Sequence, residues 1–136
     1  MERYIQQLLE TFPNDLNCVI KHFPLSSHQM AFPGAMAALA AGKQGKFWEF
    51  HGQLLENHNQ INDQKITEIA TGLGLNMEQF NTDLKSPESR GLIQADIQDG
   101  RRVGVRGTPS VFLNGKRIKN QDLGSLPQLI RRELAK

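Results

Sequence analysis

Cysteine is nearly absent from this sequence, which has a single one, Cys18, among 136 residues. One cysteine cannot form an intramolecular disulfide, so the chain as written has neither a structural bridge nor a dithiol redox pair. Long apolar runs are missing too: none approaches the roughly 20 residues that a membrane-spanning helix needs. The start also lacks the charged-then-apolar order of a secretory signal. These absences predict a chain that is cytoplasmic as written and has no membrane partner.

Negative charge is scarce in the C-terminal third of the chain. Residues 90–136 carry ten Lys and Arg against four Asp and Glu, whereas residues 1–89 carry six against ten. Such a basic excess could meet a nucleic-acid backbone, but neither interleaved aromatic residues nor a known reader motif accompanies it. We therefore interpret it as a solvated surface and expect no nucleic-acid partner.

Metal-ligand and catalytic patterns are also missing. The four histidines, His22, His28, His51 and His58, include no pair at the i, i+4 spacing that places two ligands on one helical face. No Ser-His-Asp pattern, carboxylate pair or phosphate loop occurs either. We expect surface or packing histidines, no metal, no cofactor and no catalytic residue in this chain.

The first 23 residues do predict regular structure, a helix followed by a strand. Residues 2–12 have apolar side chains at helical spacing, and Pro13 ends the pattern. Residues 16–23 form a short apolar run that is typical of a mostly buried strand, with Cys18 inside it as a small buried hydrophobe. A helix and then a strand make half of a βαβ unit, whose first strand is absent from this sequence.

The middle of the chain predicts four or five short helices. Residues 31–41 are small and apolar, and residues 47–55 carry an apolar stripe that includes Trp48. Side chains suited to helix N-caps follow at three places: Asn62 or Asp63, Asn76 and Ser86. The last of these helices should run towards Arg102.

The C-terminal part predicts a hairpin and a final helix. Residues 108–113 are rich in β-forming side chains, and Asn114-Gly115 supplies the positive φ angles of a tight turn before residues 116–119. A last amphipathic helix then starts near Ser125. The expected order is helix, strand, several helices, strand, strand and helix.

Three segments give the sequence a resemblance to a known family. They are residues 21–25 (KHFPL), 45–51 (GKFWEFH) and 104–115 (GVRGTPSVFLNG). They resemble the DsbA-like thiol-disulfide oxidoreductases, and the third is the most specific, since it combines a pre-proline turn, a strand and an Asn-Gly hairpin. The resemblance implies an α/β, thioredoxin-like fold of the DsbA type, with residues 1–136 as one domain and a helical insertion at roughly 30–103.

The resemblance also implies a binding site. In thioredoxin-like folds the proline that matches Pro109 is cis and lies beside the redox cysteines, where neighbouring backbone groups pair with an extended substrate peptide. A cis bond is uncommon even before proline, so a fold that keeps one usually uses it. An ordinary trans proline opening an edge strand is the alternative. We expect Gly107, Thr108, Pro109 and Ser110 to form a loop that binds a substrate or peptide.

The sequence departs from the family at its start. Family members reach their first helix through a central strand that ends in Cys-x-x-Cys, and this sequence has neither. The sheet should be reduced by that loss, leaving residues 16–23 and 110–113 with open edges, where each unpaired buried group costs about 1 to 3 kcal/mol. Either these two strands pair directly in a three-stranded sheet, or a second copy or another protein supplies the missing pairing; we favour a homodimer.

Two functions therefore stay open. The first is a redox-inactive DsbA-like module that binds an extended peptide or a protein partner at the cis-Pro loop. The alternative is an N-terminally truncated form of an active thiol-disulfide oxidoreductase, which acts on exported proteins. In that case the natural protein would be periplasmic.

Overall fold

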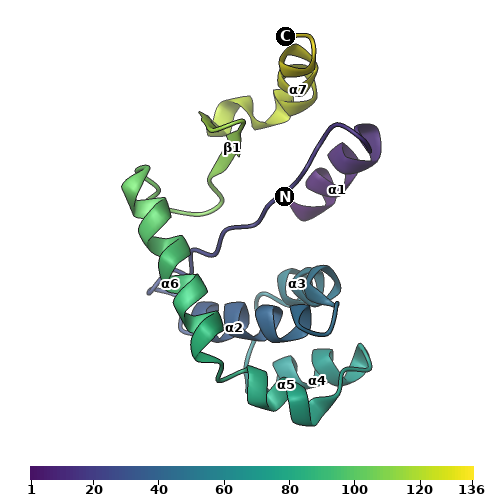
Figure 1. Cartoon of the computed structure of the whole chain (residues 1–136), viewed down its shortest axis with the longest axis vertical. Helices are drawn as coiled ribbons and strands as arrows, with labels where there is room; N and C mark the ends of the chain where they lie inside the picture. The colour runs from purple at the N-terminus through teal and green to yellow at the C-terminus, as the bar shows by residue number, and fades with distance from the viewer. The chain divides into compact units, whose positions relative to one another are not determined.

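The computed structural model describes residues 1–136 as two compact units. Met1–Ile20 and Gly107–Lys136 form the first, here called the hairpin unit, and Lys21–Arg106 form the second, the helical unit. Figure 1 shows the elements of both units coloured along the chain. None of the helices has the length and the apolar character needed to cross a bilayer.

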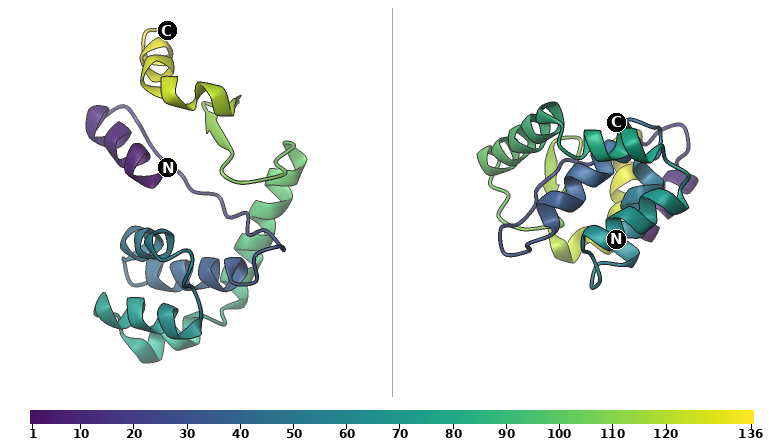
Figure 2. Two further views of the ribbon diagram at one scale, coloured as in Figure 1. Left: turned by 180° about the vertical axis from the view of Figure 1, so that it is seen from behind. Right: turned by 90° about the horizontal axis from the view of Figure 1, so that it is seen from below.

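The helical unit is built around one helix made largely of small residues. Its helices are α2 (Ala31–Gly42), α3 (Phe47–Glu56), α4 (Asp63–Gly72), α5 (Met77–Asp83) and α6 (Pro87–Arg102). Helix α2 contacts each of the other four, and both views in Figure 2 show α2 to α5 gathered side by side. Ala37, Ala40 and Ala41 have no exposed surface, because small side chains let neighbouring helices approach α2 closely.

Two aromatic rings fill the centre of the helical unit. Phe50 of α3 and Phe80 of α5 have no exposed surface, and their ring centroids lie 5.7 Å apart. Ile66 and Ile69 of α4 pack into the same cluster. The predicted stripe on α3 is only partly buried, since Trp48 is 47% exposed. A stripe that wide cannot all face α2 and α4 at once, so one side remains at the surface.

Side-chain caps begin three of these helices, as the sequence predicts. The side chains of Asn62, Asn76 and Ser86 each accept a hydrogen bond from the backbone N–H three residues later, at 2.8, 3.0 and 3.3 Å. Each cap satisfies one of the N–H groups that the first helical turn leaves without a partner. The expected start and end of α6 are confirmed at Pro87 and Arg102.

The hairpin unit joins the two ends of the sequence. It contains α1 (Glu2–Thr11), β1 (Val111–Leu113), β2 (Lys116–Ile118), the 3-10 helix η1 (Asn120–Ser125) and α7 (Leu126–Leu134). Its buried core is small and consists of Leu8, Phe12, Leu126 and Ile130. The hydroxyl of Tyr4 donates a hydrogen bond of 2.8 Å to the carbonyl of Leu123, which links α1 to η1.

The hairpin has the tight turn that the sequence predicts. Strands β1 and β2 are antiparallel, with Leu113 opposite Lys116 and Val111 opposite Ile118. Between them, Asn114 has a φ of 47° and Gly115 a φ of 78°. Two consecutive positive φ angles are typical of a type I′ turn, whose twist matches that of the flanking strands.

The expected strand at residues 16–23 is wrong, and so is the three-stranded sheet built on it. These residues form neither helix nor strand, and the sheet consists of β1 and β2 alone. Val19 is 70% exposed and Cys18 is half-buried. An apolar run becomes a strand only where a neighbour pairs with its N–H and C=O groups, and none does here. The reduced sheet of a thioredoxin-like fold is confirmed.

Candidate functional site

The four predicted site residues form one short loop that leads into β1. The Thr108–Pro109 peptide bond is cis. Thr108 and Pro109 are exposed, while Gly107 and Ser110 are half-buried. The loop therefore presents its central two residues at the surface and holds its two ends against the hairpin unit.

The hydroxyl of Ser110 connects this loop to the second strand. It donates a hydrogen bond of 2.8 Å to the carbonyl of Gly107, across the two residues at the centre of the loop. It also accepts one of 3.3 Å from Nη2 of Arg117 on β2. One small side chain thus closes the loop and positions a guanidinium group beside it.

The hairpin has one core face and one exposed face. Val111, Leu113 and Ile118 pack against the core of the hairpin unit. Phe112 alternates to the other face, where 39% of it is exposed, and Arg117 lies directly opposite it on β2. Since paired residues of an antiparallel ladder share a face, Phe112 and Arg117 lie together there with Ser110.

One edge of β1 has no strand paired with it. In an antiparallel pair, residues alternate between those that bond across the ladder and those whose N–H and C=O point away from it. In a hairpin with a two-residue turn, the flanking residues bond to each other, here Leu113 and Lys116. The N–H and C=O groups of Phe112 and Ser110 are therefore directed away from β2. An extended polypeptide can pair with such an edge.

His22 belongs to a separate cluster in the helical unit. This cluster anchors the segment that leads to α2. Its backbone N–H donates a hydrogen bond of 2.9 Å to Oδ2 of Asp96 on α6. Nζ of Lys21 lies 2.7 Å from Oδ1 of the same carboxylate, which is 8% exposed. Hydrogen bonding to Asp96 raises the pKa of Lys21, whereas burial lowers the pKa of His22. Sequence patterns give no signal for this contact, because it joins residues far apart in the chain.

The other histidines take up packing and surface positions. The His51 ring stacks on Phe47, with centroids 5.6 Å apart, and the His22 ring meets Phe47 edge-on at 6.1 Å. His28 and His58 are exposed and lie outside this stack. No group of three or more His, Cys, Asp or Glu side chains comes close enough together to hold a metal ion.

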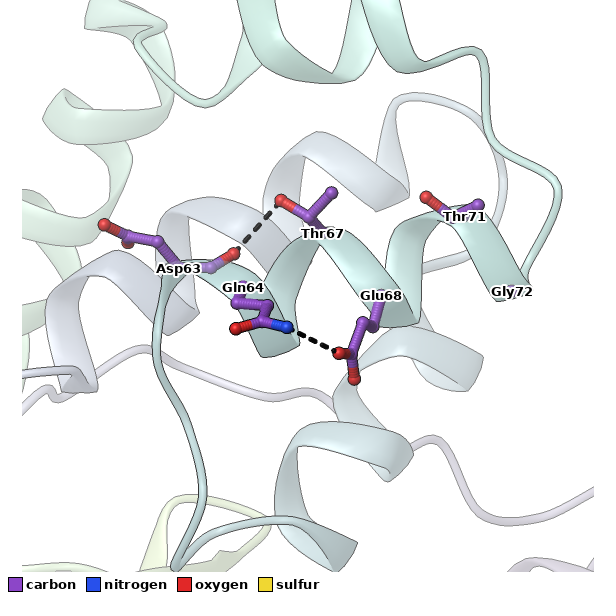
Figure 3. A pocket seen from close by; sticks show the side chains of 6 residues that line it. All are labelled: Asp63, Gln64, Thr67, Glu68, Thr71 and Gly72. Atoms are coloured by element: carbon purple, nitrogen blue, oxygen red, sulfur yellow. Dashed lines mark hydrogen bonds between the residues drawn. The ribbon is translucent and has the colours of Figure 1, made fainter.

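A hollow on the helical unit is formed by a single helix, α4. It is lined by Asp63, Gln64, Thr67, Glu68, Thr71 and Gly72, whose side chains lie along one side of the helix in Figure 3. Thr67 donates a hydrogen bond of 3.0 Å to the carbonyl of Asp63, and Gln64 donates one of 3.3 Å to Glu68. These hydrogen bonds run along α4 itself, and every lining residue belongs to this helix. The hollow therefore brings together no side chains from different elements.

The fold and this loop define the class of the protein as thioredoxin-like. A family model described as Thioredoxin matches residues 2–132. The solved structure of a thioredoxin-like oxidoreductase from Silicibacter pomeroyi DSS-3 is 26% identical, with a TM-score of 0.77. It is matched over 96% of this chain and 79% of its own. The chain belongs to the thioredoxin family, and its fold is that of the DsbA-like thiol-disulfide oxidoreductases.

A second solved structure has the same fold. It is the thiol-disulfide exchange protein alpha-DsbA2 from Wolbachia pipientis, which is 21% identical with a TM-score of 0.85. The match covers 96% of this chain and 72% of that one. At 21% identity, the likeness shows a shared fold alone.

Curated relatives are much longer proteins. An Na(+)/H(+) antiporter NhaA 1 from Mycolicibacterium vanbaalenii is 34% identical over 118 residues, which are 85% of this chain and 19% of the antiporter. An NhaA antiporter from Herminiimonas arsenicoxydans is 30% identical over 108 residues, 17% of its length. The chain therefore spans about a fifth of the length of these relatives.

Proposed function

We propose that this chain binds an extended polypeptide segment at Gly107, Thr108, Pro109 and Ser110 by adding it as a strand to β1. The observation that carries the proposal is the open edge of β1 directly after the exposed pair Thr108 and Pro109. Likeness to the thiol-disulfide oxidoreductases supports it, because enzymes of that family act on polypeptides. Main-chain hydrogen bonds would supply affinity, and neighbouring side chains would supply specificity.

As this chain is written, its role is binding rather than disulfide exchange. It contains no Cys-x-x-Cys, and its one thiol, Cys18, is half-buried with a pKa that burial raises. A thiol with a raised pKa holds little thiolate at neutral pH, and the thiolate is the reactive form. The same module could hold a polypeptide without reacting with it.

We also propose that residues 1–136 act as one thioredoxin-like domain with an inserted helical part. The sequence predicts that insertion at roughly 30–103, and the compact helical unit spans Lys21–Arg106. The support is that both ends of the chain fold into one unit.

Backbone methylation of a test peptide examines strand addition directly. Two versions of an alternating Thr-Val peptide would carry N-methyl groups at odd or at even positions, so that each version loses the donors of one edge. Strand addition uses only one edge of the added strand. Fluorescence anisotropy should therefore show that each version binds through the edge that it keeps, whereas a peptide methylated at every position does not bind. Binding of the fully methylated peptide would reject strand addition.

A second copy of this chain is the alternative partner for the open edge of β1. A copy of the chain has its own open β1 edge, and two such edges could pair in a homodimer. Sedimentation velocity over a range of concentrations should then show a dimer that dissociates when the unmethylated peptide is added. A monomer at all micromolar concentrations would exclude the homodimer and leave the edge to a different partner.

Disulfide exchange is the second candidate function, and family membership favours it. It requires a longer natural form that carries a Cys-x-x-Cys ahead of Met1, and such a form would work on exported proteins in the periplasm. In an insulin reduction assay with dithiothreitol, we expect the present chain and Cys18→Ser to match the background rate. Activity in the present chain that disappears in Cys18→Ser would overturn the binding role. The genomic sequence upstream of Met1 tests the longer form.

A further inference from the structure

We propose that the polypeptide bound at β1 is acidic and that Arg117 selects it. This inference rests on the proposed binding function and names the chemistry of the ligand. Specifically, the bound strand would place a carboxylate beside Ser110 and an apolar side chain beside Phe112. These two positions are separated by one residue, because alternate residues of an extended strand share a face.

The charge of the hairpin favours an anionic partner. Residues 107–121 contain three cations, Lys116, Arg117 and Lys119, and no Asp or Glu. Lys116 alternates to the core face, near Glu133 of α7, whose pKa is lowered first by the hydrogen bond from Lys136 and also by the charge of Lys116. Arg117 lies on the exposed face with Phe112. Lys119 follows β2 in an extended conformation, with φ −69° and ψ 148°, so alternation directs it to that same face.

The guanidinium of Arg117 is aimed at the start of β1. Its Nη2 donates the 3.3 Å hydrogen bond to the Ser110 hydroxyl, so the charged group crosses from β2 to the strand that has the open edge. A guanidinium carries five N–H donors in a planar fork that suits a carboxylate. We infer that it binds a carboxylate on the far side of β1 in addition to the partners that it already has, of which Ser110 is one.

The geometry of an added strand places the two ligand side chains. Neighbouring strands lie about 4.8 Å apart, and directly opposite side chains of one face are in contact. A ligand residue opposite Ser110 would meet the guanidinium of Arg117. The ligand residue two positions away would meet the exposed ring of Phe112, of which 39% is accessible. The recognised segment thus has an acidic residue and an apolar residue separated by one residue of any kind, in either chain direction.

A second copy of this chain fits the same edge poorly. The segment that it could offer, Ser110 to Leu113, contains no carboxylate. Two hairpins edge to edge would also bring the two Arg117 groups and the two Lys119 groups towards one another. Like charges across a ladder are destabilising, so the charge pattern favours an acidic partner over self-association.

Three peptides of closely matched composition test the ligand pattern on the unmodified protein. The probe is fluorescein-labelled Thr-Glu-Thr-Val-Thr, together with its Gln analogue and the register control Thr-Thr-Glu-Val-Thr, which directs Glu and Val to opposite faces. We expect the probe to bind about fivefold more tightly than either control, as suits an exposed charge-assisted contact. The advantage should shrink as salt is raised. The reversed peptide Thr-Val-Thr-Glu-Thr reports the direction of the strand.

Substitutions at two neighbouring residues distinguish a specific role of Arg117 from the effect of the hairpin's overall positive charge. Arg117→Gln should abolish the preference for the Glu probe over its Gln analogue, whereas Lys116→Gln removes the same charge from the opposite face and should keep it. Equal loss of the preference in both variants would reject a specific role for Arg117. Tight binding of all peptides by the unmodified protein would overturn the acidic preference and keep the proposed function. No binding of any peptide would overturn both.

Discussion

The two units of this protein differ in how completely they bury their cores. The helical unit encloses two phenylalanine rings without exposed surface, and buried alanine and isoleucine side chains pack in the same cluster. The hairpin unit has four buried residues and a two-stranded sheet with an open edge. Binding surfaces come from parts of a fold that leave groups unpaired. The larger buried core therefore lies in the helical unit, whereas the proposed binding site lies in the hairpin unit.

Each unit contains its own spectroscopic reporter. The chain has one tryptophan, Trp48, and one tyrosine, Tyr4. Trp48 lies on α3 of the helical unit, where its ring meets Phe47 edge-on at 5.4 Å. Tyr4 lies in the hairpin unit, bonded to Leu123. The two side chains allow unfolding to be followed in each unit separately.

The largest expected effect is in the core of the helical unit. Phe80→Ala removes a ring with no exposed surface that lies 5.7 Å from Phe50. We expect a loss of about 3 to 5 kcal/mol in the free energy of unfolding, because the cavity cannot fully collapse. Urea denaturation followed by Trp48 fluorescence measures it. Leu55→Ala, at a residue that is 45% exposed, is the control, and an equal loss there would contradict the proposed core.

The next effect concerns the anchor of the segment before α2. Asp96→Ala removes the acceptor of the His22 N–H and the partner of Lys21, and we expect a loss of about 3 kcal/mol. Asp99→Ala serves as the control, because Asp99 lies about one turn further along α6 and is also bonded to Lys21 at 3.3 Å, but its side chain is 49% exposed. It should cost no more than about 1 kcal/mol. Similar losses in both variants would show that the anchor depends on surface charge alone.

A smaller effect is expected at the turn of the hairpin. Gly115 has a φ of 78°, which strains any residue with a Cβ, so Gly115→Ala should destabilise the hairpin unit by about 1 kcal/mol. Urea denaturation followed by NMR signals of β1 measures this loss. Gly124→Ala is the control in the same unit, because its φ is not positive and an added Cβ would meet no atom within 4 Å. Equal losses would contradict the type I′ turn.

The smallest effect is a dependence of stability on pH in the helical unit. Burial lowers the pKa of His22 from its ordinary value of 6.5, and the attraction of Asp96 opposes this only in part. The unfolded chain therefore binds a proton more readily, so the stability from neutral His22 is present above about pH 6.5 and is lost as the pH falls towards the folded pKa. His51 and Lys21 act in the same direction as burial.

Urea midpoints between about pH 5.5 and pH 7.5 measure this dependence. We expect the midpoint to fall on acidification and the slope to flatten in His22→Gln. His28→Gln, at an exposed histidine of the same unit, should keep the slope of the unmodified protein. A slope that is the same in all three proteins would contradict the role of His22.

Local structure could be predicted from the sequence because its causes lie within a few residues. Asn62, Asn76 and Ser86 cap helices through the N–H three positions later. Asn114 and Gly115 form the turn because their own backbones tolerate positive φ angles. The expected strand at residues 16–23 failed for the opposite reason, since a strand needs a partner that no local pattern can guarantee.

The candidate site could be predicted only in part. The resemblance to a known family pointed to Gly107, Thr108, Pro109 and Ser110, but Arg117 was not foreseen. The register of the hairpin contained a signal for it, because a two-residue turn fixes which residue lies opposite Phe112. Asp96 could not be found in this way, since its contact with His22 spans 74 residues and leaves no periodicity in the sequence.

Amide hydrogen exchange with and without the Thr-Glu-Thr-Val-Thr peptide tests the division of roles between the two units most directly. The N–H groups of Phe112 and Ser110 should exchange more slowly when the peptide is bound, because both would then be paired. Those at the centre of the helical unit, such as Phe50 and Ile69, should keep their rates. Slower exchange in the helical unit with none at Phe112 and Ser110 would contradict recognition by the open edge of β1.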